Sequence, residues 1–197
     1  MIGKLVPLRR ISGETVQLSD EALLAACATG DSAALGALFD RFHEVVYRFA
    51  GRLATTDEGA RDDLVQATFL ELQRTAGAFR GTSSVRTWIF GVAANVARHT
   101  LRGERRRRVR QAKYLEQIDV APPQVDEQVE QRKLLARIEE AVEGLPRDQQ
   151  VAFILCDLER LPAIEVARVL EIPEGTLWRR LHTARKALRA AIERTTR

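Results

Sequence analysis

Apolar side chains recur at helical spacing along this chain, and this periodicity limits the fold more than any other feature of the sequence. The clearest stripe consists of Leu35, Leu38, Phe39, Phe42, Val45, Val46, Phe49 and Leu53. This spacing places one apolar face on a long α-helix. Ser19 and Asp31 precede helical segments as candidate N-caps, and residues 77–84 interrupt the pattern before a further helix. No segment shows the alternation typical of strands, so the sequence predicts an all-α protein.

A segment of different composition divides the helical pattern into two halves. Residues 111–131 contain Pro122-Pro123, and residues 114–131 carry five acids but no Lys or Arg. Such a composition is typical of an extended linker. We therefore predict two small helical domains: a flexible N-terminal tail (1–18), a four-helix domain (19–110), a flexible acidic linker (111–131) and a second helical domain (132–197).

Basic residues are concentrated on either side of this linker. The net charge is only +4, but residues 98–113 contain eight basic residues and one acid. Residues 175–197 contain seven basic residues and one acid. Two positive segments separated by a negative one indicate two contacts with a polyanion such as nucleic acid.

The histidines and cysteines form no recognisable catalytic or metal-binding pattern. His43, His99 and His182 are isolated and lack the spacing of metal ligands. Cys27 and Cys156 lie far apart among aliphatic residues, as expected for reduced, buried thiols. The sequence also contains no serine elbow and no phosphate-binding glycine loop. We therefore expect no enzyme activity, metal or cofactor.

Membrane insertion is not expected from the sequence. No apolar run approaches the roughly 18 residues that a membrane span requires. The first residues lack the apolar core of a signal peptide. We therefore expect a cytoplasmic protein.

Residues 162–186 have the layout of a helix-turn-helix. The small Ala167 stands where two helices must approach closely, and Ile172 lies in the turn. The second helix is expected to run from Thr176 to about Ile192, with Leu177, Leu181 and Leu188 facing inward. It is expected to expose Thr176, Trp178, Arg179, Arg180, His182, Thr183, Arg185 and Lys186. An α-helix fits the major groove, where arginine can bind guanine through two hydrogen bonds. The alternative is an ordinary helical hairpin with a solvated charged face. Trp178 could contact the DNA or pack against the core of its own domain.

A second candidate surface lies on the fourth helix of the first domain. Trp88, Gly91, Asn95, Arg98 and Arg102 fall on one helix face. An aromatic ring, an amide and two guanidinium groups suit single-stranded DNA, whose bases stack while its backbone meets cations. The preceding residues 79–84 could hold an unstacked base. The alternative for Trp88 is a place in the core, and both can hold if one edge of its ring is exposed.

Several motifs of this chain resemble those of bacterial sigma factors of the extracytoplasmic-function group. Region 2 of that family is similar to four segments: Asp63-Leu64-Val65-Gln66-Ala67-Thr68-Phe69, Phe79-Arg80-Gly81, Arg86-Thr87-Trp88-Ile89 and Asn95-Val96-Ala97-Arg98. Region 4 is similar to Leu145-Pro146-Arg147-Asp148-Gln149-Gln150 and to the stretch from Gly175-Thr176-Leu177 to Ala184-Arg185. The resemblance covers residues 19–110 and 132–192 in the family's order.

The resemblance implies a role for each domain in promoter recognition by core RNA polymerase. Asp63, Gln66 and Phe69 match the motif that binds the clamp coiled coil of the β′ subunit. The segment holding a flipped −10 base, and the helix after it, correspond to Phe79, Gly81, Thr82, Ser83, Trp88, Asn95, Arg98, His99 and Arg102. Region 4 reads the −35 duplex and touches the β flap. The acidic linker resembles the segment that runs through the polymerase's active channel, and the family implies control by an anti-sigma protein.

The chain departs from the family's pattern at four positions of the second domain. Trp178 replaces a residue that is usually basic, and Thr183 replaces one that is often basic. Glu171 stands at a turn position usually held by glycine, and Arg160 interrupts the usual Glu-Gly-Leu. These departures affect the −35 sequence preference, for which we expect Arg179, Arg180 and Arg185 to contact DNA.

Three other functions explain less of the sequence. A helix-turn-helix regulator acting on duplex DNA uses only residues 132–192 and leaves 63–98 without a role. Tight, specific duplex binding without polymerase would favour it. A nuclease or metal hydrolase requires ligand clusters that the sequence lacks, and an adaptor that only binds proteins does not account for two basic segments.

Overall fold

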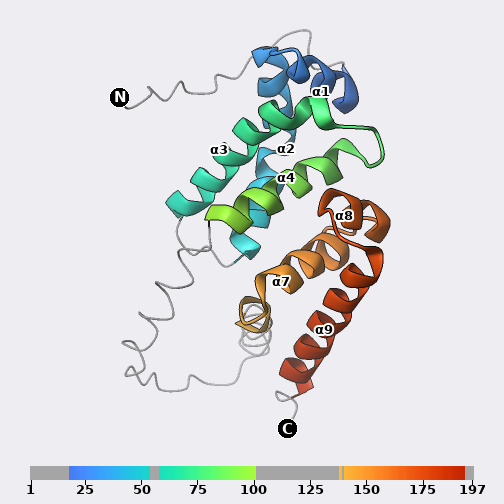
Figure 1. Cartoon of the computed structure of the whole chain (residues 1–197). Coiled ribbons are helices and arrows are strands. Elements are labelled where there is room, and N and C mark those ends of the chain that lie inside the picture. Colours follow the sequence, from blue (N-terminus) through green and yellow to red (C-terminus); the bar gives the residue numbers. More distant parts are fainter. Residues whose placement is uncertain (1–17, 54–57, 101–137, 139, 194–197) are drawn as a thin grey trace.

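A computed structural model describes residues 18–53, 58–100, 138 and 140–193, and these ranges contain helices and no strands (Figure 1). The prediction of an all-α protein is therefore confirmed. The predicted tail up to residue 17, the whole acidic linker and the basic residues 101–110 lie outside the described residues. We call residues 18–100 the N-terminal module and residues 138–193 the C-terminal module.

The N-terminal module consists of four helices and a short turn. The helices are α1 (Asp20–Ala28), α2 (Ser32–Arg52), α3 (Glu58–Thr75) and α4 (Val85–Thr100), with a 3₁₀ turn at Ala76–Ala78. Phe49 of α2 meets Phe90 of α4 edge to face, with ring centroids 5.5 Å apart. Both rings are at most 1% exposed, so they join two helices through the middle of the module.

Local capping explains where these helices begin and end. The Ser19 hydroxyl accepts a hydrogen bond from the Ala22 amide, and the Asp31 carboxylate accepts from the Ala33 amide at 2.8 Å. Gly30, with φ +91°, supplies the left-handed residue that ends α1. The Ser84 hydroxyl accepts from the Thr87 amide at the start of α4. The caps predicted at Ser19 and Asp31 are confirmed, and Ser84 rather than Ser83 caps α4.

The C-terminal module is built around its last helix. A helical segment ends at Glu143. After it come α7 (Arg147–Phe153), one turn of π-helix (Ile154–Leu158), α8 (Ala163–Val169) and α9 (Glu174–Glu193). The predicted core positions Leu177, Leu181 and Leu188 are buried. Helix α9 begins two residues before the predicted Thr176, because the Pro173 carbonyl accepts from the amides of Thr176 and Leu177.

The two modules pack directly against each other through α4 and α8 (Figure 1). One hydrophobic cluster runs through both, from Leu23 in α1 to Leu181 in α9. At the centre of the contact, a Cβ placed on Gly91 would lie 2.6 Å from the Cβ of Val169. The expectation that Gly91 belongs to an open, DNA-facing stripe is therefore wrong for this arrangement, because α8 covers it.

Candidate nucleic-acid interface

Helix α9 carries most of the residues expected to read duplex DNA. Arg179, His182, Thr183 and Lys186 are exposed, and Thr176 is partly exposed. The side chain of Trp178 is 51% exposed, so it does not fold back onto the core. A helix with these side chains on one face has the shape and the donors that major-groove recognition requires.

Two arginines of α9 are held by acids from elsewhere in the module. The Arg180 Nη2 lies 2.7 Å from Asp148 Oδ2. Arg185 donates two hydrogen bonds to Asp157, from Nε at 2.8 Å and from Nη2 at 2.6 Å. This hydrogen bonding raises the pKa of Arg185. Acids from α7 and from the π-helical turn therefore balance part of the positive charge of α9.

Arg180 differs from the other candidate readers in its burial. Its side chain is only 20% exposed, and its Nη1 is buried without a hydrogen-bond acceptor among the described residues. The expectation that Arg180 is an exposed member of the set is wrong, because the side chain turns toward Asp148 at the start of α7. Its contact with DNA stays a prediction.

The residues expected to hold an unstacked base form an exposed loop before α4. Gly81 has φ +67°, a left-handed conformation that glycine adopts without strain. Gly81 and Thr82 are exposed, and Ser83 is partly exposed. The Phe79 ring meets the Trp88 ring edge to face, with centroids 5.7 Å apart. The small residues therefore lie beside an aromatic pair.

The sequence allowed Trp88 either to contact DNA or to pack in the core, and its position in the structure lies between these two alternatives. Its ring is partly buried, and it packs against the hydrophobic core. Its Nε1 is buried with no acceptor in the described part of the chain. The exposed part of the ring remains available for stacking against a base.

The remaining residues that we expect to bind single-stranded DNA lie at the C-terminal end of α4. Asn95 and Arg98 are partly exposed and His99 is exposed. Arg98 Nε lies 3.8 Å from Asp148 Oδ1, so Asp148 of α7 stands between this arginine and Arg180 of α9. Arg102 lies outside the described residues.

Helix α3 carries the candidate polymerase-binding residues, and only some of them reach the surface. Asp63 is exposed and Gln66 is partly exposed. Phe69 is only 1% exposed, and its ring packs against Phe39 at 4.9 Å. The prediction that Phe69 contacts a partner is therefore wrong for this structure, because the ring supports α3 from within the core.

A groove beside the acidic start of α3 was not found from the sequence. It encloses about 420 Å³ between α2 and α3, and its lining includes His43, Tyr47 and Asp62. The His43 ring stacks on Phe39 at 5.0 Å. The helical period of α2 shows which residues are apolar, but not that a groove opens beside them.

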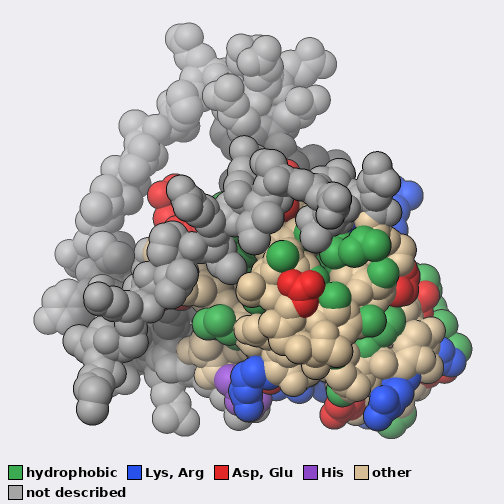
Figure 2. Space-filling model, turned by 90° about the horizontal axis from the view of Figure 1, so that it is seen from above, with side chains coloured by type: hydrophobic (Ala, Val, Ile, Leu, Met, Phe, Trp, Pro, Cys, Tyr) green, Lys and Arg blue, Asp and Glu red, His purple; other side chains and the backbone are tan. Residues whose placement is uncertain are grey.

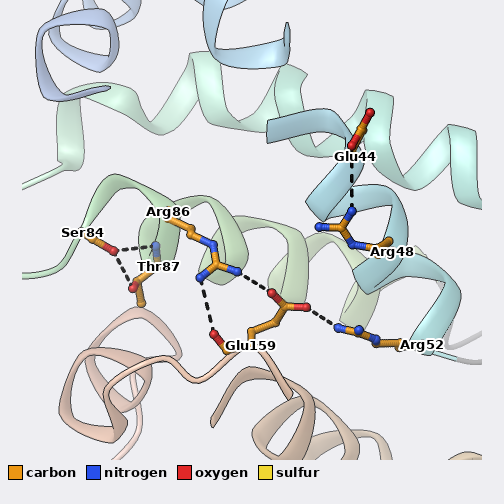
Figure 3. A network of polar contacts seen from close by, with 7 residues as sticks. All are labelled: Glu44, Arg48, Arg52, Ser84, Arg86, Thr87 and Glu159. Carbon is orange, nitrogen blue, oxygen red and sulfur yellow. Dashed lines mark hydrogen bonds and ion pairs between the residues drawn. The ribbon is translucent and has the colours of Figure 1, made fainter. Parts of the chain in front are cut away.

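A polar network that the sequence did not predict joins the two modules (Figure 3). The carboxylate of Glu159 pairs with Arg52 of α2 and, at 2.5 Å, with Arg86 of α4. The Glu159 side chain is only 6% exposed. Glu165 of α8 accepts hydrogen bonds from the Ser84 amide at 3.0 Å and the Thr87 hydroxyl at 2.8 Å.

The charge on the end of the molecule around α1 is mixed. Figure 2 shows side chains of both signs scattered on this face, with hydrophobic groups between them. The candidate DNA-binding residues lie on α4, in the loop before it, and on α9. Within the described ranges, no group of His, Cys, Asp and Glu side chains could hold a metal ion. None of the described helices is both long and apolar enough to span a membrane.

Each of the two modules of this chain matches a known sequence family. The sequence family Sigma-70 region 2 matches residues 38–107, and Sigma-70, region 4 matches residues 135–188. SigM of Mycobacterium tuberculosis H37Rv, an ECF RNA polymerase sigma factor, is 33% identical over 170 residues, which are 86% of this chain and 83% of SigM. The ECF sigma-E factor of Haemophilus influenzae is 28% identical over 185 residues, covering 90% of this chain and 97% of that protein.

Solved structures share the same arrangement of helices. CnrH, in complex with the cytosolic domain of CnrY, is 25% identical to this chain with a TM-score of 0.61. The match covers 88% of this chain and 97% of CnrH. The sigma factor RpoE of Bartonella quintana, in complex with the anti-sigma factor NepR, has a TM-score of 0.53 at 21% identity and covers 79% and 94% of the two chains.

Proposed function

The chain belongs to the ECF RNA polymerase sigma factors, and on that premise we propose how its two modules share promoter recognition. The N-terminal module binds the β′ clamp coiled coil and the melted −10 strand. The C-terminal module reads the −35 duplex and touches the β flap. The chain acts in the cytoplasm with core polymerase, which performs the catalysis, and it is not itself an enzyme.

The observation that carries this proposal is the presence of two chemically different exposed surfaces on one chain. Helix α9 offers the exposed Arg179, His182 and Lys186, which suit a groove and its phosphates. The loop before α4 offers Phe79 and the first turn of α4 offers Trp88, and their rings suit unpaired bases. A regulator of duplex DNA has no use for the second surface.

Joining two weak binding surfaces explains how the duplex is opened. Each module alone binds DNA weakly, but polymerase holds both at a fixed separation and raises the effective concentration of the second contact. Binding of unpaired −10 bases then offsets the cost of unstacking them, which is a few kcal/mol. Asn95, Arg98 and His99 at the end of α4 supply polar contacts for that strand.

The polymerase contact is assigned to the exposed side of α3. Asp62 and Asp63 are exposed at its N-terminal part, and Gln66 lies one turn further on. Carboxylates in this position can dock a basic partner, and they also stabilise the helix N-terminus. Phe69 contributes only by holding α3 in place.

An anti-sigma protein is the proposed regulator of this chain. RpoE of Bartonella quintana was solved with the anti-sigma factor NepR, and it has the same fold as this chain. A protein that binds either DNA-facing surface or the α3 face would prevent transcription.

The proposal is tested by adding the purified chain to core polymerase. We expect transcription to start at defined sites on genomic DNA, and the mapped sites to share two upstream elements. Asp63→Lys should abolish binding to core polymerase, whereas Arg74→Ala, at an exposed pair on the same helix, should leave it unchanged. A chain that does not bind core polymerase at all would reject the proposal.

A second pair of variants separates the two DNA contacts. Arg98→Ala should reduce strand opening, measured by permanganate reactivity of unpaired thymines, while −35 binding persists. Arg179→Ala should weaken binding to the −35 duplex and leave opening on a pre-melted template intact. Unchanged opening in a folded variant that lacks the charges of both Arg98 and Arg102 would refute the assignment of the N-terminal module.

A further inference from the structure

Arg80, in the loop before α4, differs from every other arginine that the structure describes in the N-terminal module. Arg61 lies over the ring of Tyr47, 5.8 Å from its centroid. The others pair with acids, and they are Arg41, Arg48, Arg52, Arg74, Arg86 and Arg98. Arg80 is exposed and meets no acid and no aromatic ring among the described residues.

The backbone around Arg80 also has unused hydrogen-bond donors. The amides of residues 80–83 donate to no acceptor in the described part of the chain. On either side of this run the amides are used, since Phe79 donates to the Ala76 carbonyl at 3.1 Å and Ser84 donates to Glu165 at 3.0 Å. The free donors of the loop are therefore confined to residues 80–83.

Gly81 leaves open space in front of these donors. Its φ of +67° is left-handed, and a Cβ placed on it would meet nothing within 4 Å. Successive amides beside a left-handed residue form a concave surface that can bind an anion. Figure 1 shows this loop at the edge of the N-terminal module, where it joins the end of α3 to the start of α4. The loop thus has both the donors and the room for an anionic group.

A phosphodiester is the anion that these groups suit. A guanidinium can donate two parallel hydrogen bonds to phosphate oxygens, and backbone amides are also common phosphate donors. Phe79, which meets Trp88 edge to face, directly precedes Arg80 in the chain. An unpaired base that stacks on this aromatic pair brings its own phosphate close to the next residues of the loop. Ring and cation therefore match the base and the backbone of one nucleotide.

We propose that Arg80 and the amides of residues 80–83 bind the phosphate next to the unstacked −10 base. This inference rests on the assignment of residues 79–84 to that base. A contact with phosphate fixes the position of the strand without reading its sequence. Arg98 lies roughly 20 Å along α4 from its first residue, so the two arginines hold different phosphates of the strand.

The test uses core polymerase with the full chain and a pre-melted promoter template. In this template, one phosphate of the −10 strand is replaced by a neutral methylphosphonate, and its position is moved along the strand. Arg80→Ala removes the guanidinium, whereas Arg80→Lys keeps the charge. Arg74→Ala is the matched control, because it removes the same charge from an exposed arginine of α3. Circular dichroism would confirm that each variant is folded.

We expect Arg80→Ala to lower affinity for the unmodified template about tenfold, since a hydrogen bond between charged groups is lost. A methylphosphonate beside the unstacked base should weaken binding of the wild-type chain by a similar factor and leave Arg80→Ala unaffected. In that variant the slope of log affinity against log salt concentration should become shallower by about 0.7, as for one lost contact with a single strand. Arg80→Lys should keep most of the affinity, and Arg74→Ala should keep all of it.

The inference is overturned if Arg80→Ala binds the template as tightly as the wild-type chain does. It is also overturned if Arg80→Ala binds more weakly but stays sensitive to the same methylphosphonate, since Arg80 would then contact a different group. A loss from Arg74→Ala equal to that from Arg80→Ala would reduce the effect to net charge and overturn it as well. Failure of the proposed function is distinguishable, because it is read from wild-type binding to core polymerase.

Discussion

Glu171 occupies the turn between α8 and α9 with a left-handed backbone, φ 53°. The Ile172 amide donates to the Ala167 carbonyl and the Glu171 amide to the Arg168 carbonyl. These two bonds are those of a helix C-cap whose left-handed residue is usually glycine. At the end of α1 the same two bonds surround Gly30, with φ +91°. This cap is therefore formed with glycine at the end of α1 and with glutamate at the end of α8.

The comparison predicts that Glu171→Gly stabilises the protein. A residue with a Cβ loses about 1–2 kcal/mol in the left-handed region, and glycine avoids this cost. Glycine also makes the unfolded chain more flexible, which costs about 0.4–1 kcal/mol. The expected net gain in the free energy of unfolding is about 0.5–1 kcal/mol, or about 2 °C in melting temperature for a chain of this size.

Urea unfolding followed by circular dichroism measures this gain. Glu171→Ala serves as the control, because it removes the carboxylate but keeps the Cβ, and it should give no stabilisation. Gly30→Ala should lose about 1 kcal/mol, since a Cβ there meets nothing within 4 Å and the cost is purely conformational. Equal gains from Glu171→Gly and Glu171→Ala would refute the reasoning, because charge and not backbone strain would then explain both.

Three further predictions concern other parts of the molecule. Asp157→Asn frees Arg185 from its double hydrogen bond. Affinity for the −35 duplex should therefore rise, and the slope of log affinity against log salt concentration should steepen by about one. A salt titration followed by fluorescence anisotropy measures both quantities. Burial raises the pKa of both Cys27 and Cys156 to about 11. Iodoacetamide should therefore alkylate the native protein slowly until the pH approaches 11. The free energy of unfolding should decline above pH 9, because the thiols of the unfolded chain ionise at a lower pH than those of the folded chain. Rapid alkylation of the native protein at neutral pH would contradict the burial of these thiols. Phe90→Ala removes a ring that is 1% exposed and should lower the free energy of unfolding by about 3–5 kcal/mol in a urea titration.

Local signals in the sequence were sufficient to find most helices. Ser19 and Asp31 cap α1 and α2 as predicted, because N-cap hydrogen bonds join residues only two or three positions apart. The apolar stripe of α2 and the leucines of α9 are buried for the same reason, since helical spacing alone assigns them to one face. The start of α9 was misplaced by two residues, as the Pro173 carbonyl also accepts bonds in its first turn.

The candidate site was predicted less completely than the helices. The exposed positions Arg179, His182 and Asp63 follow from polar residues on amphipathic helices. Phe69 was misassigned because a motif match does not distinguish a residue that touches a partner from one that supports the helix. Gly91 was misassigned because periodicity shows that a residue shares a face, not whether another helix covers it.

The sequence by itself determined that this chain is helical, which faces of its helices are apolar, and which family it resembles, because these properties are carried by residues within a few turns of one another. Only the tertiary structure decided the partners of its charges. Arg52 and Glu159 are separated by 107 positions, and Arg180 and Asp148 by 32. No local spacing specifies such pairs, because the first forms only where packing brings the C-terminal module against α2 and α4, and the second only where α7 packs against α9. The surfaces that meet DNA, and what covers them, therefore depend on that packing.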